Sequence, residues 1–169
     1  LTIHPAWIYS RKAFVITGAV CTLLIISVSA YGILNQWRLK IKTFDVKVDK
    51  QVKAKDSLKI VLLADLHFGY SIGRRHAELL VKEINAQSPD LVCIAGDVFD
   101  NEYEGLKDPE KTASILRSIR SKYGVYACWG NHDLSEPILA GFTFRTPKKE
   151  YDDPRMYEFL KAANIRLLN

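Results

Sequence analysis

The first half of the chain opens with one long apolar segment. Residues 13–34 carry no charged side chain. At a rise of about 1.5 Å per residue, a helix of this length spans roughly the 30 Å hydrocarbon core of a bilayer. We therefore predict a transmembrane anchor at 13–34, preceded by an N-terminal flank at 1–12. A signal peptide is the alternative, because Arg11 and Lys12 would form its charged beginning, but the apolar run is longer than signal peptides usually have.

Residues 35–57 form a basic juxtamembrane linker. Between 37 and 59 there are eight Lys or Arg and three Asp, whereas 60–169 holds 14 basic and 16 acidic side chains. The basic charge therefore follows the anchor, which suits either anionic lipid headgroups or a solvated linker, and it disfavours nucleic acid as a partner. Within the linker, residues 43–48 alternate apolar and polar side chains, which predicts one half-exposed strand.

From residue 58 onward, apolar runs alternate with amphipathic stretches. The runs predict buried strands at 58–64, 91–95, 125–129 and from 165. The stretches predict helices at 74–87, from Asp108 as N-cap to near Gly124, and from Asp152 to about Asn164. Residues 134–150 have no clear period and predict a long loop or a hairpin. This alternation indicates an α/β domain with a mainly parallel sheet covered on both faces.

Three of these strands end in residues that suit metal ions, and such residues gather at the carboxyl edge of a parallel sheet. After the first strand, Asp65 and His67 would project to the same side of an extended segment and grip one ion. After the second, Gly96 leaves room for close backbone approach, and the Asp97 carboxylate can bridge two ions. After the third, Asn131 can offer an amide oxygen. Oxygen and imidazole ligands without thiolates favour manganese, iron, zinc or magnesium.

Other polar residues have simpler interpretations. The cysteines lie in apolar runs at spacings that predict neither disulfides nor a zinc site: Cys21, Cys93 and Cys128. His4 and His76 are expected to be structural or exposed. Arg74 and Arg75 are expected to be a solvated helix start rather than a phosphate clamp.

Three blocks carry a family resemblance: Asp65-Leu66-His67, Gly96-Asp97-Val98-Phe99-Asp100 and Gly130-Asn131-His132-Asp133. In this order, with helices between them, they resemble the first three signature blocks of the calcineurin-like metallophosphoesterases. The resemblance covers about residues 43–169. It implies an α/β/β/α sandwich, of which 58–169 would be the first half of a C-terminally truncated domain.

The resemblance also implies a role for each matching residue. Asp65 and His67 would hold a first metal, Asp97 would bridge, and Asn131 would hold a second. His132 would lie beside the scissile phosphate, and Asp133 would orient it by accepting its ring proton. Asp100 would support the ligands rather than bind an ion itself. The family pattern continues with further histidines, and none follows His132 here, so we expect the chain from Leu1 to Asn169 to be a fragment that binds metal poorly by itself.

The implied function is metal-dependent hydrolysis of phosphodiesters or phosphomonoesters by an activated water and two divalent ions, with Mn, Fe or Zn expected. The anchor and spacer resemble those of membrane-associated bacterial phosphodiesterases. Lipid-linked or nucleotide-activated substrates, membrane lipid as a partner and a single-pass cell-membrane location follow as expectations, with the side of the catalytic part left open. A nuclease and a non-catalytic scaffold that has lost its metals are the competing functions.

Overall fold

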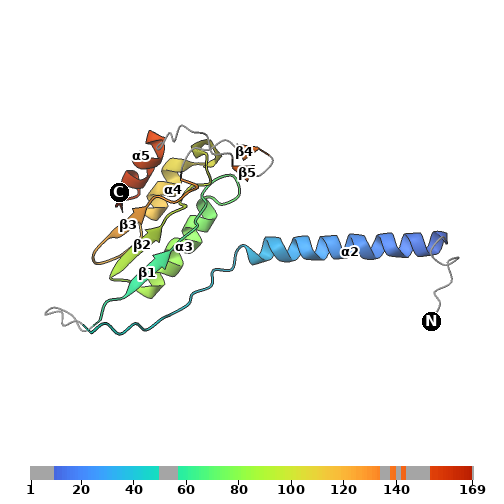
Figure 1. Cartoon of the computed structure of the whole chain (residues 1–169), viewed down its shortest axis with the longest axis horizontal. Helices are drawn as coiled ribbons and strands as arrows, with labels where there is room; N and C mark the ends of the chain where they lie inside the picture. The colour runs from blue at the N-terminus through green and yellow to red at the C-terminus, as the bar shows by residue number, and fades with distance from the viewer. Residues whose placement is uncertain (1–9, 50–56, 134–137, 140–141, 144–152, 169) are drawn as a thin grey trace. The chain divides into compact units, whose positions relative to one another are not determined.

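The computed structural model describes residues 10–49, 57–133, 138–139, 142–143 and 153–168. The chain forms two compact units, 1–47 and 48–169, which are treated separately. The first unit contains helix α2, Arg11–Asn35 (Figure 1). The Ser10 side chain accepts a hydrogen bond from the Ala13 N–H at 3.1 Å and caps the start of this helix. Of its side chains only that of Ala13 is buried, and the helix is long and apolar enough to cross a membrane.

The linker after α2 differs from the prediction. Residues 38–49 follow no helix or strand, and the strand expected at 43–48 is absent. Its apolar side chains Phe44, Val46 and Val48 are each more than 70% exposed. An alternating pattern specifies which face of a strand is apolar, but a strand forms only where a neighbour supplies hydrogen bonds. None of the described residues pairs with this segment.

The second unit is built on a four-stranded parallel sheet with the order β1-β2-β3-β6. Its strands are β1 Ile60–Leu63, β2 Leu91–Ala95, β3 Val125–Cys128 and β6 Ile165–Leu167. The expected strands at 91–95 and from 165 are confirmed, and those at 58–64 and 125–129 are slightly shorter than predicted. Ile60 aligns with Leu91, Val92 with Val125, and Val125 with Ile165, so the carboxyl ends of all four strands lie at one edge.

Three helices connect these strands: α3 Arg74–Gln87, α4 Pro109–Leu116 and α5 Pro154–Ala162. The bounds of α3 are those predicted. Helix α4 ends at Leu116, eight residues before Gly124. The Asn85 side chain of α3 forms hydrogen bonds with the backbone that follows α4. Asn85 donates to the Ser118 carbonyl at 3.0 Å and accepts from the Arg120 N–H at 2.7 Å. Asp108 is the N-cap residue of α4, but its side chain makes no capping hydrogen bond.

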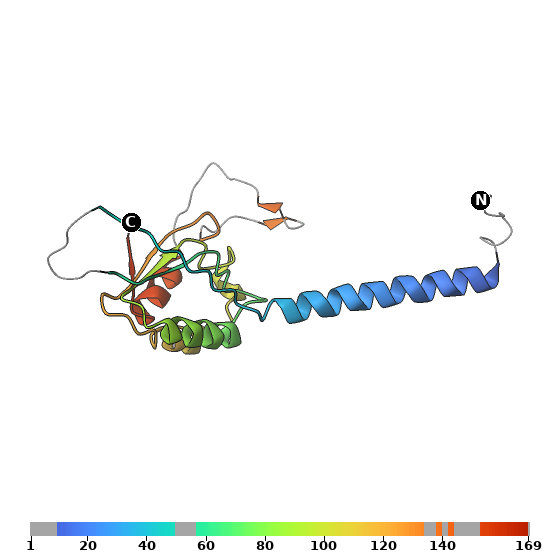
Figure 2. The same ribbon diagram turned by 90° about the horizontal axis from the view of Figure 1, so that it is seen from below.

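All three helices pack against the same face of the sheet, so the expectation of cover on both faces is wrong for the described residues. Buried side chains of the helices meet Val92, Ile94, Val125, Ala127 and Ile165 in one core. A right-handed crossover always leaves a sheet on the same side when the strands follow in sequential order, which places every helix in one layer. Figure 2 shows α3 (green) on that side. On the other face, Ile60 is 50% and Leu62 70% exposed.

Two short segments complete the described structure. A 3-10 turn, η1 Tyr103–Gly105, follows β2, and a two-stranded antiparallel hairpin pairs β4 Ile138–Leu139 with β5 Phe142–Thr143. The hairpin agrees with one of the two forms predicted for 134–150, most of which lies outside the described residues. The loops that follow β1, β2 and β3 all begin at the carboxyl edge of the sheet.

Candidate metal centre

Three loops meet at that edge, one after each of β1, β2 and β3. Backbone hydrogen bonds extend the pairing of β1 and β2 beyond the strands. His67 N–H donates to the Asp97 carbonyl at 3.0 Å, Phe68 N–H to Val98 at 2.8 Å, and Asp100 N–H to Phe68 at 3.1 Å. Phe68 and Phe99 are at most 1% exposed beneath these loops. The loops therefore pack on the buried side chains of Phe68 and Phe99.

Glycines allow the second and third loops to touch. A Cβ at Gly130 would lie 2.2 Å from Asp97 Oδ1 and 2.4 Å from the Asp97 nitrogen, so no other residue fits without displacing this carboxylate. A Cβ at Gly96 would lie 2.7 Å from the Gly130 Cα, and Gly96 also has φ +80°. In the first loop, a Cβ at Gly69 would lie 2.9 Å from the Asp100 Cβ. Of these three glycines, only Gly96 was predicted from the sequence to allow a close backbone approach.

The backbone that carries the ligands is left-handed rather than extended. Asp65, His67, Asp97 and Asn101 have φ between +46° and +61°. Asn, Asp and His adopt this conformation more often than other non-glycine residues do, although it costs free energy for each of them. The predicted neighbourhood of Asp65 and His67 is observed, whereas the reason given for it, an extended segment, is wrong. Strained backbone of this kind gathers at functional sites, where surrounding contacts hold it in place.

Two overlapping groups of side chains could hold a metal ion. Asp65, His67 and Asp97 form one group, and His67, Asp100 and His132 form the other. Within each group, the potential ligand atoms all lie within 4.8 Å of one another. The rings of His67 and His132 meet edge to face with centroids 4.9 Å apart. Asp100, expected only to support the ligands, thus belongs to a potential ligand group, with Oδ1 3.7 Å from His67 Nδ1.

Asp133 occupies a different position from the one expected. Its Oδ1 accepts a hydrogen bond from the Phe99 N–H and its Oδ2 one from the Gly130 N–H, both at 2.8 Å. The carboxylate is 2% exposed and ties the second loop to the third, and it makes no hydrogen bond to the His132 ring. Burial raises the pKa of Asp133, and the two backbone donors oppose that rise. Its hydrogen bonds thus hold the second and third loops together.

The His132 ring contacts Asn101 instead, a residue for which the sequence predicted no role. Asn101 Oδ1 lies 3.0 Å from His132 Nδ1, and the Asn101 N–H donates to the His132 carbonyl at 3.0 Å. The Asp97 carboxylate also holds His132, because Asp97 Oδ1 accepts a hydrogen bond from the His132 N–H at 2.8 Å. The available signal was an Asn directly after the second block, a residue type that suits a left-handed position.

The other residues singled out from the sequence lie on the third loop, on α3 or outside the described residues. Asn131 is exposed on the third loop, and its side chain makes no hydrogen bond to the described residues. His76 lies in the first turn of α3, and burial lowers its pKa. Arg74 lies 3.7 Å from Glu78 and 4.0 Å from Asp108, in agreement with a surface position rather than a phosphate clamp. His4 lies outside the described residues.

The charges of the centre fit a divalent cation. Within the described part of the chain, no Lys or Arg forms an ion pair with the four carboxylates that gather here: Asp65, Asp97, Asp100 and Asp133. Carboxylates held this close repel one another unless a cation or a proton compensates them. The donors are oxygens and imidazole nitrogens, and no cysteine belongs to either group, which is the ligand chemistry of divalent metal sites that lack thiolates.

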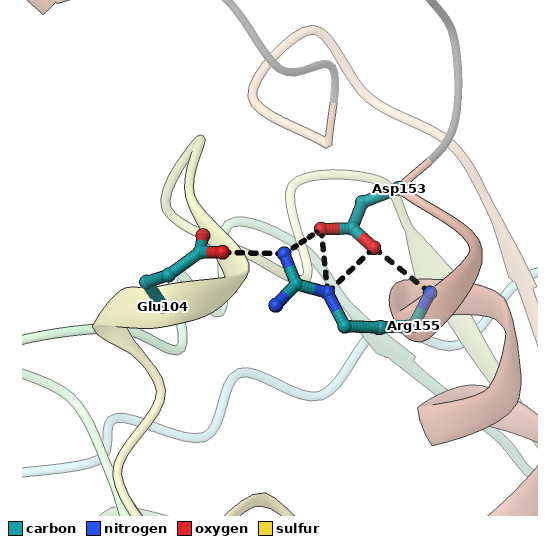
Figure 3. A network of polar contacts seen from close by, with 3 residues as sticks. All are labelled: Glu104, Asp153 and Arg155. Atoms are coloured by element: carbon teal, nitrogen blue, oxygen red, sulfur yellow. Dashed lines mark hydrogen bonds and ion pairs between the residues drawn. The ribbon is translucent and has the colours of Figure 1, made fainter.

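A second polar cluster, drawn in Figure 3, is compensated by the protein itself. The Arg155 guanidinium forms hydrogen bonds with the carboxylates of Asp153 and Glu104, and the Asp153 side chain also accepts the Arg155 N–H at 2.9 Å as the N-cap of α5. Arg155 lies over the Tyr103 ring, 4.9 Å from its centroid. The hydrogen bonds from Arg155 lower the pKa of both carboxyl groups.

Comparisons with known proteins agree with this geometry. The family model described as calcineurin-like phosphoesterase matches residues 58–167. The chain is 33% identical over 116 residues, 68% of its length, to a transmembrane protein with metallophosphoesterase domain from Bos taurus, and covers 26% of it. It is 35% identical over 118 residues, 69% of its length, to an uncharacterized metallophosphoesterase from Campylobacter jejuni, and covers 31% of it.

A more distant relative has a stated substrate. Over 123 residues, 71% of the chain, it is 26% identical to a UDP-2,3-diacylglucosamine pyrophosphatase from Chlamydia trachomatis, of which 37% is covered. The fold, the three loops and these matches define one class: the chain belongs to the calcineurin-like phosphoesterase family, whose members are hydrolases. It spans about a quarter to two fifths of the length of these relatives.

Proposed function

We propose that this protein is a membrane-anchored hydrolase that cleaves phosphoesters at a centre of two divalent metal ions. The observation that carries the proposal is the pair of ligand groups that share His67 at the carboxyl edge of the sheet. Two groups with a common member suit two neighbouring ions better than one. When bound, such ions would supply charge neutralisation for the phosphoryl oxygens and an acidified water as nucleophile.

Within this proposal, Asp65 and His67 would hold the first ion, Asp97 would offer its carboxylate to both, and Asp100 and Asn131 would contribute to the second. Asp97 is suited to its place because its carboxylate is buried and already fixed by the His132 N–H. His132 belongs to the second group, where its ring can stabilise the phosphoryl group or protonate the leaving oxygen. Asp133 maintains the contact between the second and third loops.

We further propose that α2 is a single-pass anchor and that the substrate is membrane-associated. Helix α2 has the length and composition for it, and the relative from Bos taurus is named a transmembrane protein. The Chlamydia trachomatis relative is named for a diacylated sugar nucleotide, which is a lipid-linked pyrophosphate. A lipid-linked or nucleotide-activated phosphoester is therefore the substrate class to test first, with anionic lipid beside the linker.

The decisive test is manganese-dependent hydrolysis of a generic phosphodiester and a generic monoester by the full-length protein. Asp97→Asn keeps the size of the side chain and its contact to His132, but removes the charge that two cations need. We expect kcat/KM to fall roughly 10³-fold, about 4 kcal/mol of transition-state stabilisation.

The matched control is Glu158→Gln, which neutralises an exposed carboxylate on α5 that pairs with Lys161. It should retain wild-type activity. Full activity of Asp97→Asn would refute the bridging role, and a wild-type protein without metal-dependent hydrolysis would support the non-catalytic scaffold instead. Comparing a diacylated sugar nucleotide with a soluble diester then tests the substrate class.

A further inference from the structure

The His132 ring is held from one side by a residue that no family block includes. Asn101 is 4% exposed, and its carbonyl oxygen lies 3.0 Å from His132 Nδ1. Its backbone N–H donates to the His132 carbonyl at 3.0 Å, so one residue contacts both the main chain and the ring of the histidine. Asn101 makes both contacts with a left-handed backbone, at φ +61°.

We propose that Asn101 is the positioning residue of His132: it accepts the Nδ1 proton and leaves Nε2 as the atom directed to the reacting phosphoryl group. An amide oxygen only accepts hydrogen bonds, so the contact requires a proton on Nδ1. A neutral ring with that proton carries its lone pair on Nε2. This inference rests on the proposed function for the role of His132, whereas the contact and the tautomer do not depend on it.

A neutral amide suits this position better than a carboxylate. Four Asp side chains already gather at the three loops, and a fifth negative charge would add repulsion among them. The expected orienter, Asp133, is committed to the Phe99 and Gly130 N–H groups. Asn101 is thus the described residue whose side chain fixes the rotation of the His132 ring without adding charge.

The test reads the tautomer directly. The full-length protein, labelled with ¹⁵N in its histidines and loaded with Zn²⁺, is studied by NMR at about pH 8, well above the ordinary histidine pKa of about 6.5. The His132 signals are assigned by their loss in His132→Gln. We expect a protonated Nδ1 and an unprotonated Nε2. A proton on Nε2 in the wild type, as an amide turned with its NH₂ group toward the ring would produce, overturns the proposal.

Two variants separate the acceptor from the backbone. Asn101→Gly tolerates the left-handed φ but lacks the acceptor, so the ring should populate both tautomers, and kcat should fall roughly 10–100-fold with KM within about twofold. Asn101→Asp restores the acceptor and should restore the Nδ1 tautomer. The matched control is Asn164→Gly, because Asn164 also has a positive φ, +58°, and is exposed after α5.

The outcomes distinguish this inference from the proposed function. If Asn101→Gly keeps the wild-type tautomer and kcat, Asn101 does not position the ring. If the wild type hydrolyses none of the phosphoesters but shows the Nδ1 tautomer, the contact stands and the proposed function fails. Should Asn101→Gly not fold, the wild-type spectrum alone still decides between the two tautomers.

Discussion

Two clusters of acidic side chains in the same unit show opposite ways of compensating charge. Around Arg155, two carboxylates share one guanidinium at the surface, and the group is complete within the protein. At the carboxyl edge of the sheet, four carboxylates lie beside two histidines with no Lys or Arg ion pair from the described residues. The backbone there is left-handed at four positions and depends on close-packed glycines.

The difference separates a structural contact from a binding site. An exposed ion pair contributes little and requires no special backbone, because water already solvates both partners. A partly buried group of carboxylates without a cation costs stability, and it is retained where a ligand completes it. The two clusters should therefore respond differently to a lost glycine, to metal removal and to the loss of a basic partner.

The largest effect is expected from Gly130→Ala. The added methyl group would collide with the Asp97 backbone and carboxylate, which cannot move without breaking the hydrogen bond to His132. We expect a loss of about 3 kcal/mol in the free energy of unfolding, at the upper end of overpacking penalties. Metal-dependent activity should fall roughly 100-fold, as it does when reacting groups are displaced by about 1 Å. Chemical denaturation and kinetics measure the two effects.

The control for Gly130→Ala is Gly73→Ala, because no atom lies within 4 Å of a Cβ at Gly73 and its φ is −141°. It should differ little from the wild type. Equal behaviour of the two variants would mean that the second and third loops are not packed as closely as the comparison requires.

An intermediate effect is expected from metal removal. An ion that binds the folded state alone stabilises it by about 2.7 kcal/mol when its free concentration is 100 times its Kd. Thermal unfolding of the full-length protein with Mn²⁺ or Zn²⁺, and again after EDTA, should show a reversible rise in Tm. Asp97→Asn should abolish the rise, whereas Asp153→Asn, which alters the Arg155 cluster, should preserve it. A rise of the same size in both variants would place the ion elsewhere.

The sequence predicted those elements whose limits are local. Helix α3 has the predicted bounds because one apolar stripe is followed directly by Ser88 and Pro89. The end of α4 could not be predicted, since it depends on Asn85, a residue more than 30 positions away. The exposure of Ile60 and Leu62 was not predicted because both are as apolar as a buried strand requires. Among the described residues no helix covers them, since the sequential strand order places all three helices on the other face.

The candidate site shows the same limit. The three blocks identify residues that the structure does bring together, because the carboxyl ends of neighbouring parallel strands must meet. Which residues form hydrogen bonds between the loops depends on differences of a few tenths of an ångström in their tertiary distances. The Asp133 carboxylate therefore contacts two backbone N–H groups instead of the His132 ring, which contacts Asn101, a residue with no expected role. The steric need for Gly130 became visible only against Asp97.

The smallest effect is expected from Arg155→Gln in the compensated cluster. The exposed guanidinium should contribute little, so Tm should fall by no more than about 3 °C, and added salt should reduce the difference.

The pKa values of Asp153 and Glu104 are lowered by Arg155, so this stabilisation is present above the pKa of the unfolded chain, near 4, and is lost as pH falls through the lower folded values. The Tm values of the two proteins should therefore differ at neutral pH and converge as the pH falls well below about 4. Loss of metal-dependent activity in Arg155→Gln would instead show that the two clusters are coupled, through Tyr103 and its contact with Phe99.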